Sequence, residues 1–209
     1  MSSAVAMNRR ISRDTNPSSG SNIMNNQFIG TISSIDVVHN SHTKKKIAAF
    51  DLDWTIIRPK YNKKFPTNKN DWVFINNKIR KKINKLLKDD YYVVIFSNQG
   101  GILYKKQNVE DIIYKFNYII KKIKYKTNQL KNVSYVISYK YNKYRKPNIS
   151  MFSLYLSKLK ITKDDIDYNK SFYCGDASGR EKDFSNTDKQ FALNIKFKFH
   201  TPEEFLDIY

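Results

Sequence analysis

Two carboxylates, Asp51 and Asp53, directly follow the apolar run at residues 47–50, and Thr55 comes two positions later. An apolar strand that ends in this pattern places both acids at the carboxyl edge of an α/β sheet, where such folds carry their chemistry. Two acids this close repel each other unless a cation or a proton lies between them. The pattern therefore predicts metal-assisted phosphoryl transfer, in which one Asp attacks and the other handles protons. The alternative is a strand that ends in an ordinary polar turn.

Three other polar segments stand in similar places along the chain. Each follows an expected strand or opens an expected helix, and together they offer a hydroxyl, a cation and a further carboxylate. Because the carboxyl ends of parallel strands meet at one edge of a sheet, we expect these segments to converge on Asp51. The plainer alternatives are a solvated lysine, a turn cap and a helix cap. The segments are Ser97-Asn98-Gln99-Gly100-Gly101, Tyr144-Arg145-Lys146-Pro147 and Gly175-Asp176-Ala177-Ser178-Gly179-Arg180.

The apolar residues alternate between strand-like and helix-like segments. Runs of β-branched and aromatic residues predict strands, and apolar residues at spacings of three and four predict helices. This alternation predicts an α/β fold, in which a Rossmann-like parallel sheet carries helices on both faces. The expected strands are residues 47–50, 91–96, 133–139 and 171–174, and the expected helices are residues 77–87, 109–123, 149–159 and a last one from 202.

The first part of the chain differs in composition from the rest. Residues 1–27 are rich in Ser, Asn and Arg and lack an apolar period, so we predict a disordered arm. Residues 28–45 are predicted to be a lead-in segment, with a short edge strand at 32–38. Residues 46–209 are predicted to form one folded domain. Within it, residues 59–71 are interpreted as a polar loop or small hairpin.

A large excess of positive charge points to an anionic partner. The 209 residues include 38 Lys and Arg against 19 Asp and Glu, which gives a formal net charge of +19. Such an excess attracts nucleic acids, although the same bias toward Lys, Asn and Ile is typical of an AT-rich genome. Cys174 is the only cysteine, which excludes a disulfide framework and favours a reducing, intracellular compartment, whether nucleus or cytoplasm. The sequence has no run of about 18 apolar residues, so we expect no membrane contact.

Taken together, the four segments resemble the haloacid dehalogenase superfamily of aspartate-nucleophile phosphatases. Within it, the chain is similar to the polynucleotide kinase 3′-phosphatase family over about residues 46–209. The resemblance implies removal of a 3′-phosphate from DNA ends and a haloacid dehalogenase fold. Besides the four segments above, it is carried by Phe65-Pro66-Thr67, Asp71-Trp72, Asp183-Phe184-Ser185, Asp188, Phe191-Ala192 and Thr201-Pro202-Glu203-Glu204-Phe205.

The resemblance implies a catalytic role for four side chains. Asp51 would attack phosphorus and become an aspartyl phosphate, while Asp53 would protonate the leaving oxygen and then activate water. Ser97 and Lys146 would hold the phosphoryl oxygens. One residue departs from the wider superfamily, because Trp54 stands where a glycine is usual. We expect the indole either to point away from the phosphate or to form part of the substrate wall.

The resemblance also implies a metal and a set of substrate contacts. Mg²⁺ would be held by Asp51, by Asp176 and by the backbone carbonyl of Asp53, with Asp183 as the candidate for a second supporting acid. Mg²⁺ would remove the repulsion between a carboxylate and a phosphate dianion. Contacts to the substrate are expected from Thr55, Asn98, Gln99, Arg145 and Arg180.

Short connections leave no room for a large cap domain over the site. In this superfamily the lack of a cap goes with bulky substrates, which suits a DNA end bearing a 3′-phosphate. No Gly-x-x-x-x-Gly-Lys-Ser/Thr loop occurs, so we expect no 5′-kinase activity, and we expect a monomer. Two other functions stay open: a small-molecule phosphomonoesterase of the same superfamily, and a non-catalytic nucleic-acid-binding protein.

Overall fold

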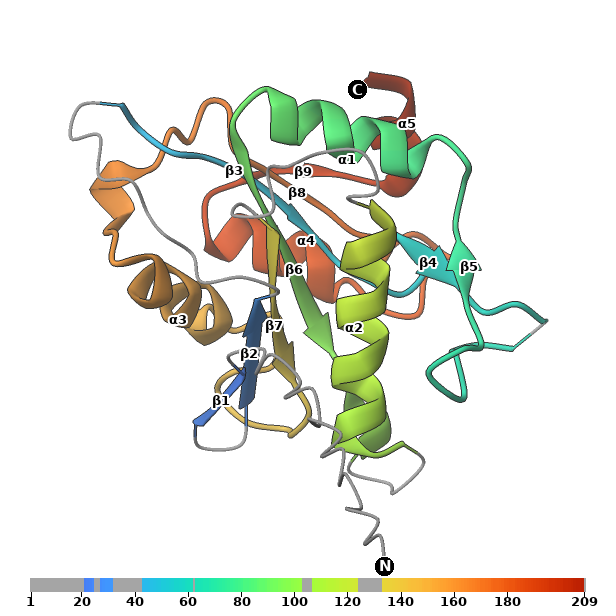
Figure 1. The fold of residues 1–209 in the computed structure, drawn as a ribbon. Coiled ribbons are helices and arrows are strands. Elements are labelled where there is room, and N and C mark those ends of the chain that lie inside the picture. Colours follow the sequence, from blue (N-terminus) through green and yellow to red (C-terminus); the bar gives the residue numbers. More distant parts are fainter. Residues whose placement is uncertain are drawn as a thin grey trace, which may run out of the picture.

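A seven-stranded sheet forms the centre of the fold (Figure 1). The structure is a computed structural model that describes residues 21–24, 27–31, 43–61, 63–102, 107–123 and 133–208. The strand order is β1-β2-β7-β6-β3-β8-β9, and the last five of these strands are parallel. They are β7 (Val133–Ser138), β6 (Tyr91–Asn98), β3 (Lys46–Phe50), β8 (Phe172–Cys174) and β9 (Lys198–His200). The predicted parallel sheet is confirmed, with β3 in the middle of it.

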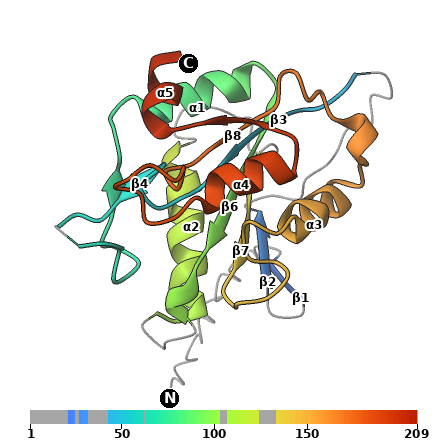
Figure 2. The same cartoon turned by 180° about the vertical axis from the view of Figure 1, so that it is seen from behind.

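Helices cover both faces of this sheet (Figures 1 and 2). Side chains alternate along a strand, so Ala48 and Phe50 of β3 pack in one buried cluster while Ile47 and Ala49 pack in the other. Because both faces are covered, the central strands are apolar throughout. The first cluster includes α1 (Ile79–Lys88), α2 (Val109–Ile123) and α5 (Pro202–Ile208), and the second includes α3 (Ser150–Leu159) and α4 (Thr187–Asn194).

Helix α2 spans the residues that the apolar spacing predicts. Its buried side chains include Phe116, Ile119 and Ile120, which lie on one face and pack against the sheet. The same face also buries Lys115, although a lysine belongs to the polar side of an amphipathic helix. This exception lies near the carboxyl edge of the sheet, where Lys115 lines a cavity.

The insertion between β3 and α1 is small. It consists of the hairpin of β4 (Ile57–Arg58) and β5 (Val73–Phe74) and the loop that joins them, which fits the predicted loop or hairpin. Short 3₁₀ turns follow β6 at Gly100–Ile102 and precede β8 at Lys163–Asp165. The residues that the structure describes include no large cap domain, as expected.

The edge of the sheet beside β7 carries two antiparallel strands. β2 (Gln27–Thr31) pairs with β7, and β1 (Ser21–Met24) pairs with β2. Five residues of the predicted disordered arm therefore lie in strands: Ser21–Met24 pair with β2 along an otherwise open edge, and Gln27 begins β2 itself. The rest of that arm up to residue 26, and the edge strand predicted at 32–38, lie outside the described residues.

Two elements near the C-terminus were not predicted from the sequence. Helix α4 is short, and its apolar residues do not form a clear stripe, so the pattern carried no signal for it. Strand β9 has three residues and includes Lys198, so it lacks the apolar run of the other strands. Helix α4 matters for the site, because Asp188 in its first turn lines the cavity there.

Candidate active site

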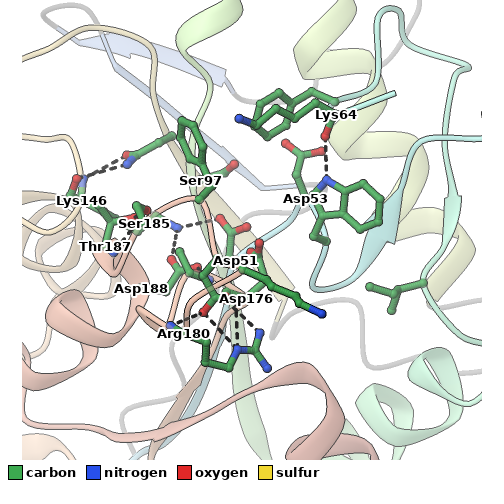
Figure 3. Close-up of a pocket in the computed structure, with 18 of the residues that line it drawn as sticks. Asp51, Asp53, Lys64, Ser97, Lys146, Asp176, Arg180, Ser185, Thr187 and Asp188 are labelled. Atoms are coloured by element: carbon green, nitrogen blue, oxygen red, sulfur yellow. Dashed lines mark hydrogen bonds and ion pairs between the residues drawn. The ribbon is translucent and has the colours of Figure 1, made fainter. Parts of the chain in front are cut away.

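The predicted polar segments meet at the carboxyl edge of the sheet. Phe50 of β3 pairs with Ile95 of β6 and with Cys174 of β8, so the residues that follow these three strands are neighbours. The edge opens into a cavity of about 530 Å³ (Figure 3). Its lining includes all four predicted catalytic residues, Asp51, Asp53, Ser97 and Lys146, and the two further predicted metal ligands, Asp176 and Asp183.

A buried lysine lies at the centre of the site. Lys146 Nζ is 2.6 Å from Asp51 Oδ1 and 2.7 Å from Asp188 Oδ1, and it donates to the Tyr173 hydroxyl at 2.9 Å. Asn98 fixes the loop that carries this lysine, because its amide oxygen accepts from Lys146 N at 3.0 Å and its amide nitrogen donates to Lys146 O at 3.2 Å. Asn98, predicted to bind substrate, therefore positions Lys146.

The charges of this cluster do not balance. Burial lowers the pKa of Lys146, but Asp188 and Asp51 outweigh it and leave the pKa raised. Burial raises the pKa of Asp51 well above its usual range, although Lys146 opposes the shift. Burial and the neighbouring Asp188 raise the pKa of Asp176 to about 7. Three carboxylates share one ammonium group, and such an excess of negative charge favours a further cation.

The geometry of the three carboxylates suits a metal. One oxygen each from Asp51, Asp176 and Asp188 lies within 4.8 Å of the other two, and Figure 3 shows the three groups turned toward one another. Carboxylate oxygens are hard ligands of the kind that Mg²⁺ prefers. The donor set therefore fits a divalent metal ion.

Asp188 takes the place in this cluster that was predicted for Asp183. The Asp183 carboxylate accepts from Ser178 N, Ser178 Oγ and Arg180 N, and it pairs with the Arg180 guanidinium at 3.0 Å. Asp183 therefore stabilises the loop at residues 178–183, to which it belongs. Gly175 makes room for Asp188, because a Cβ at that position would stand 2.5 Å from the Asp188 side chain. A glycine there lets this acid approach the site.

Asp53 lies beside a polar chain rather than in the acidic cluster. Gln99 Nε2 donates to Asp53 Oδ2 at 2.8 Å and to Ser97 Oγ at 2.9 Å. Asp53 Oδ1 is buried and has no hydrogen-bond partner among the described residues. One oxygen of Asp53 is thus fixed, and the other is left for a group that enters the cavity.

Thr55 and Trp54 shape the turn after Asp53. The Thr55 hydroxyl is buried and accepts from Asp176 N at 3.1 Å, so this predicted substrate contact supports Asp176 instead. Trp54 has a φ of 62°, in the left-handed region that favours glycine. Its indole N–H donates to Lys64 O at 2.6 Å, and the side chain lines the cavity. Trp54 therefore forms part of the wall, one of the two expected outcomes.

The two arginines that were predicted to contact substrate differ in how many partners their guanidinium groups have within the protein. Arg180 pairs with Asp183 and with Glu203 at 3.3 Å, so its charge is largely engaged. The Arg145 guanidinium lies 4.3 Å from the centre of the Tyr141 ring, and its Nη1 is buried with no hydrogen-bond partner in the part of the chain that the structure describes. Arg145 also lines the cavity, which leaves it able to meet an anion.

The fold is that of solved phosphatases of the haloacid dehalogenase type. A putative HAD-like phosphatase from Mesorhizobium loti superposes with a TM-score of 0.61 at 15% identity, over 82% of this chain and 77% of that one. The D,D-heptose 1,7-bisphosphate phosphatase of B. bronchiseptica, crystallised with magnesium and phosphate, gives a TM-score of 0.54 at 17% identity, over 74% and 78% of the two chains. At this identity the likeness shows the fold.

Sequence similarity identifies the family. Residues 46–206 match the family described as polynucleotide kinase 3 phosphatase, and the chain belongs to that family. The Saccharomyces cerevisiae polynucleotide 3′-phosphatase is 31% identical over 79% of this chain and 89% of its own length. An uncharacterized 20.8 kDa protein of Autographa californica nuclear polyhedrosis virus is 35% identical over 82% of this chain and 91% of its own.

Longer relatives match only in part. The Schizosaccharomyces pombe bifunctional polynucleotide phosphatase/kinase is 38% identical, but the match covers 77% of this chain and 37% of that protein. The chain thus spans well under half the length of this relative. Among the described residues, no helix has the length and apolar character needed to cross a membrane.

Proposed function

We propose that this protein is a Mg²⁺-dependent polynucleotide 3′-phosphatase that acts on DNA ends through an aspartyl phosphate on Asp51. The observation that carries the proposal is the convergence of Asp51, Asp53, Lys146 and an acidic cluster at one open edge, in a chain of this family. The product is a 3′-hydroxyl, which polymerases and ligases require, so the activity belongs to intracellular strand-break repair.

The metal would be held by Asp51, Asp176 and Asp188, whose oxygens converge in the cavity. When bound, it would offset the repulsion between these carboxylates and a phosphate dianion and orient the phosphate for in-line attack. Lys146 adds a fixed positive charge beside Asp51, where charge on the equatorial phosphoryl oxygens needs stabilisation. Ser97 lines the same cavity and can donate its hydroxyl hydrogen to one of those oxygens.

The first step transfers the phosphoryl group to the enzyme. A carboxylate oxygen of Asp51 attacks phosphorus, the new O–P bond forms, and the bond from phosphorus to the 3′ oxygen breaks. An alkoxide is a poor leaving group, so Asp53 gives its proton to the 3′ oxygen as it departs. Asp53 Oδ1 suits this task, because Gln99 holds the other oxygen and the buried Oδ1 has no partner among the described residues.

The second step releases inorganic phosphate. Asp53, now ionised, takes a proton from a water molecule as that water attacks phosphorus of the aspartyl phosphate. The acyl–phosphate bond breaks, the Asp51 carboxylate is regenerated, and Asp53 is again protonated. The chain returns to its starting state with one phosphate monoester and one water converted to an alcohol and phosphate.

A substrate panel tests the proposal. We expect fast release of phosphate from 3′-phosphorylated single-stranded, nicked and blunt DNA, with activity that falls as salt rises, because the net charge of +19 favours polyanions. A 5′-phosphorylated oligonucleotide serves as the matched control and should be inert. Rapid turnover of a sugar phosphate with no salt dependence would support the small-molecule phosphatase instead. Salt-sensitive DNA binding without Mg²⁺-dependent hydrolysis would support a binding protein.

A pair of substitutions distinguishes the two acids that compete for the metal role. We expect Asp188→Asn to weaken metal binding at least about tenfold, because it removes one of the three converging carboxylates. Asp183→Asn should change metal affinity less than about threefold, since this carboxylate binds its own loop, and should lower the unfolding temperature. Calorimetric titration with Mg²⁺ measures the affinity, and a thermal melt measures stability. The reverse pattern of affinities would return the metal role to Asp183.

A further inference from the structure

Lys115 is a buried cation that the proposed reaction does not use. It lies on the apolar face of α2, with 2% of its surface exposed. A buried ammonium group is costly unless it is paired. Yet among the described residues no carboxylate lies within ion-pair distance, and its hydrogen-bond partner is the neutral Gln99, with Nζ 3.4 Å from Oε1. Its Nζ also lies 5.9 Å from the centre of the Phe116 ring. Such a placement calls for a functional reason.

The contact determines which way the Gln99 amide points. Its nitrogen faces the Asp53 carboxylate and the Ser97 hydroxyl, and its oxygen faces Lys115. The two ends of an amide have nearly the same shape, so their charges select the orientation. A flipped amide would set its oxygen against a carboxylate and its NH₂ group against an ammonium group. Lys115 therefore stabilises the orientation in which Gln99 donates to Asp53.

We infer that Lys115 is a positioning residue for the acid–base group of the reaction. It acts through Gln99, which fixes Asp53 Oδ2 and so leaves Oδ1 facing the leaving oxygen and, later, the attacking water. The inference rests on the proposed function and goes beyond it, since it assigns a role to a residue that lies outside the acidic cluster and that the proposed reaction steps do not use. It also gives Gln99, predicted to contact substrate, a place in the same chain of contacts.

A rival role makes a different prediction. Lys115 also lines a neighbouring cavity of about 570 Å³ together with Asp53, Gln99 and Arg145. A substrate phosphodiester in that cavity could contact Lys115 directly. Loss of a binding contact raises KM and leaves kcat unchanged, whereas loss of acid–base alignment lowers kcat and leaves KM unchanged. The two roles therefore differ in which constant changes.

Lys115→Met removes the ammonium group and keeps most of the side-chain volume. For a short 3′-phosphorylated oligothymidylate we expect kcat to fall about 10- to 100-fold with KM within about twofold, because misplaced general acids lose part of a 10²–10⁴-fold effect. For p-nitrophenyl phosphate, whose leaving group needs little protonation, kcat/KM should fall less than about threefold. Lys115→Gln retains an N–H donor for Gln99 and should recover part of the loss.

A double-mutant cycle tests whether Lys115 acts through Gln99. Gln99→Leu should slow the oligonucleotide reaction, and adding Lys115→Met to it should change kcat by no more than about twofold, because the shared path is already broken. Lys121→Met removes an exposed charge from the same helix and should behave as wild type. Thermal melts of all variants establish that they are folded.

The inference is overturned by a KM effect alone, by equal losses on the two substrates, or by additive losses in the cycle. Failure of the proposed function has a separate signature. In that case the wild-type protein itself leaves the 3′-phosphorylated oligothymidylate intact, whatever the Lys115 variants do. Wild-type activity combined with an unaffected Lys115→Met would reject the positioning role and leave the proposed function standing.

Discussion

Asp51→Asn abolishes phosphate release, with a loss of at least about 10³-fold in kcat, because an amide oxygen cannot form the acyl phosphate that the reaction requires. The substitution leaves the fold intact. The amide that replaces the carboxylate keeps an oxygen that can accept from Lys146 Nζ, and it removes a buried negative charge whose pKa burial raises well above its usual range. The unfolding temperature in the absence of metal should therefore be equal to or higher than that of wild type. Release of phosphate from a 3′-phosphorylated oligonucleotide measures the activity.

The matched control is Asp207→Asn, which removes an exposed carboxylate from α5 and should retain full activity. Acid quenching during turnover, followed by mass spectrometry of peptides, locates the phosphoryl group. We expect it on the peptide that contains Asp51 in wild type and on no peptide in Asp51→Asn. A phosphorylated Ser97, or Asp51→Asn activity above about a tenth of wild type, would contradict the mechanism.

The fold was predictable where the apolar pattern has a clear period. Helix α2 runs over the predicted residues, and strands β3 and β6 are apolar because both faces of the sheet are buried. Strand order was not predictable, because a sequence pattern indicates where each strand lies in the chain but not which strands are its neighbours. Helix α4 was missed because its buried residues are few, and Asp188 in its first turn was therefore not placed.

The site was predictable to the extent that its residues follow strands directly. Asp51 comes after β3 and Asp176 after β8, so local sequence was enough to place both acids at the carboxyl edge of the sheet, and the pairing of these two strands brings them together. Asp188 and Lys115 come from helices, where a polar residue on the inward face looks like an interruption of the apolar stripe. Local pattern offered no way to choose Asp188 over Asp183, since both stand in the same polar segment and only the backbone path separates them.

Polar residues at the open edge of the sheet can either bind substrate or orient other side chains of the site. Thr55, Asn98 and Gln99 were expected to touch substrate, but each has a defined partner within the protein: Asp176, the Lys146 backbone and Asp53. Side chains that orient catalytic groups are as restricted in type as those that bind substrate, so a motif does not distinguish them. The sequence pattern indicated that these residues lie at the edge of the sheet, and the structure adds which partner each one contacts.

Lys146→Met should lower kcat about 10²- to 10³-fold, because it removes the ammonium group that would stabilise charge on the phosphoryl oxygens. It should also change the pH dependence. Lys146 lowers the pKa of Asp51, against the effect of burial, so its removal raises that pKa further. Asp51 attacks only when ionised, and the acidic limb of kcat/KM therefore moves to higher pH. The profile of kcat/KM against pH measures this shift.

The same substitution should lower stability, because Lys146 joins Asp51 to Asp188 in the core of the site. Removing one member of a buried ion pair costs roughly 3–5 kcal/mol, and protonation of Asp51, whose pKa burial raises, recovers part of it. The loss of stability in the absence of metal should thus be smaller at low pH, where Asp51 is neutral, than at high pH, where it is ionised. Lys143→Met, which removes an exposed charge from the same loop, is the matched control and should leave activity and stability unchanged. Activity of Lys146→Met within about threefold of wild type, with an unshifted acidic limb, would show that Lys146 supports the fold and not the phosphoryl transfer.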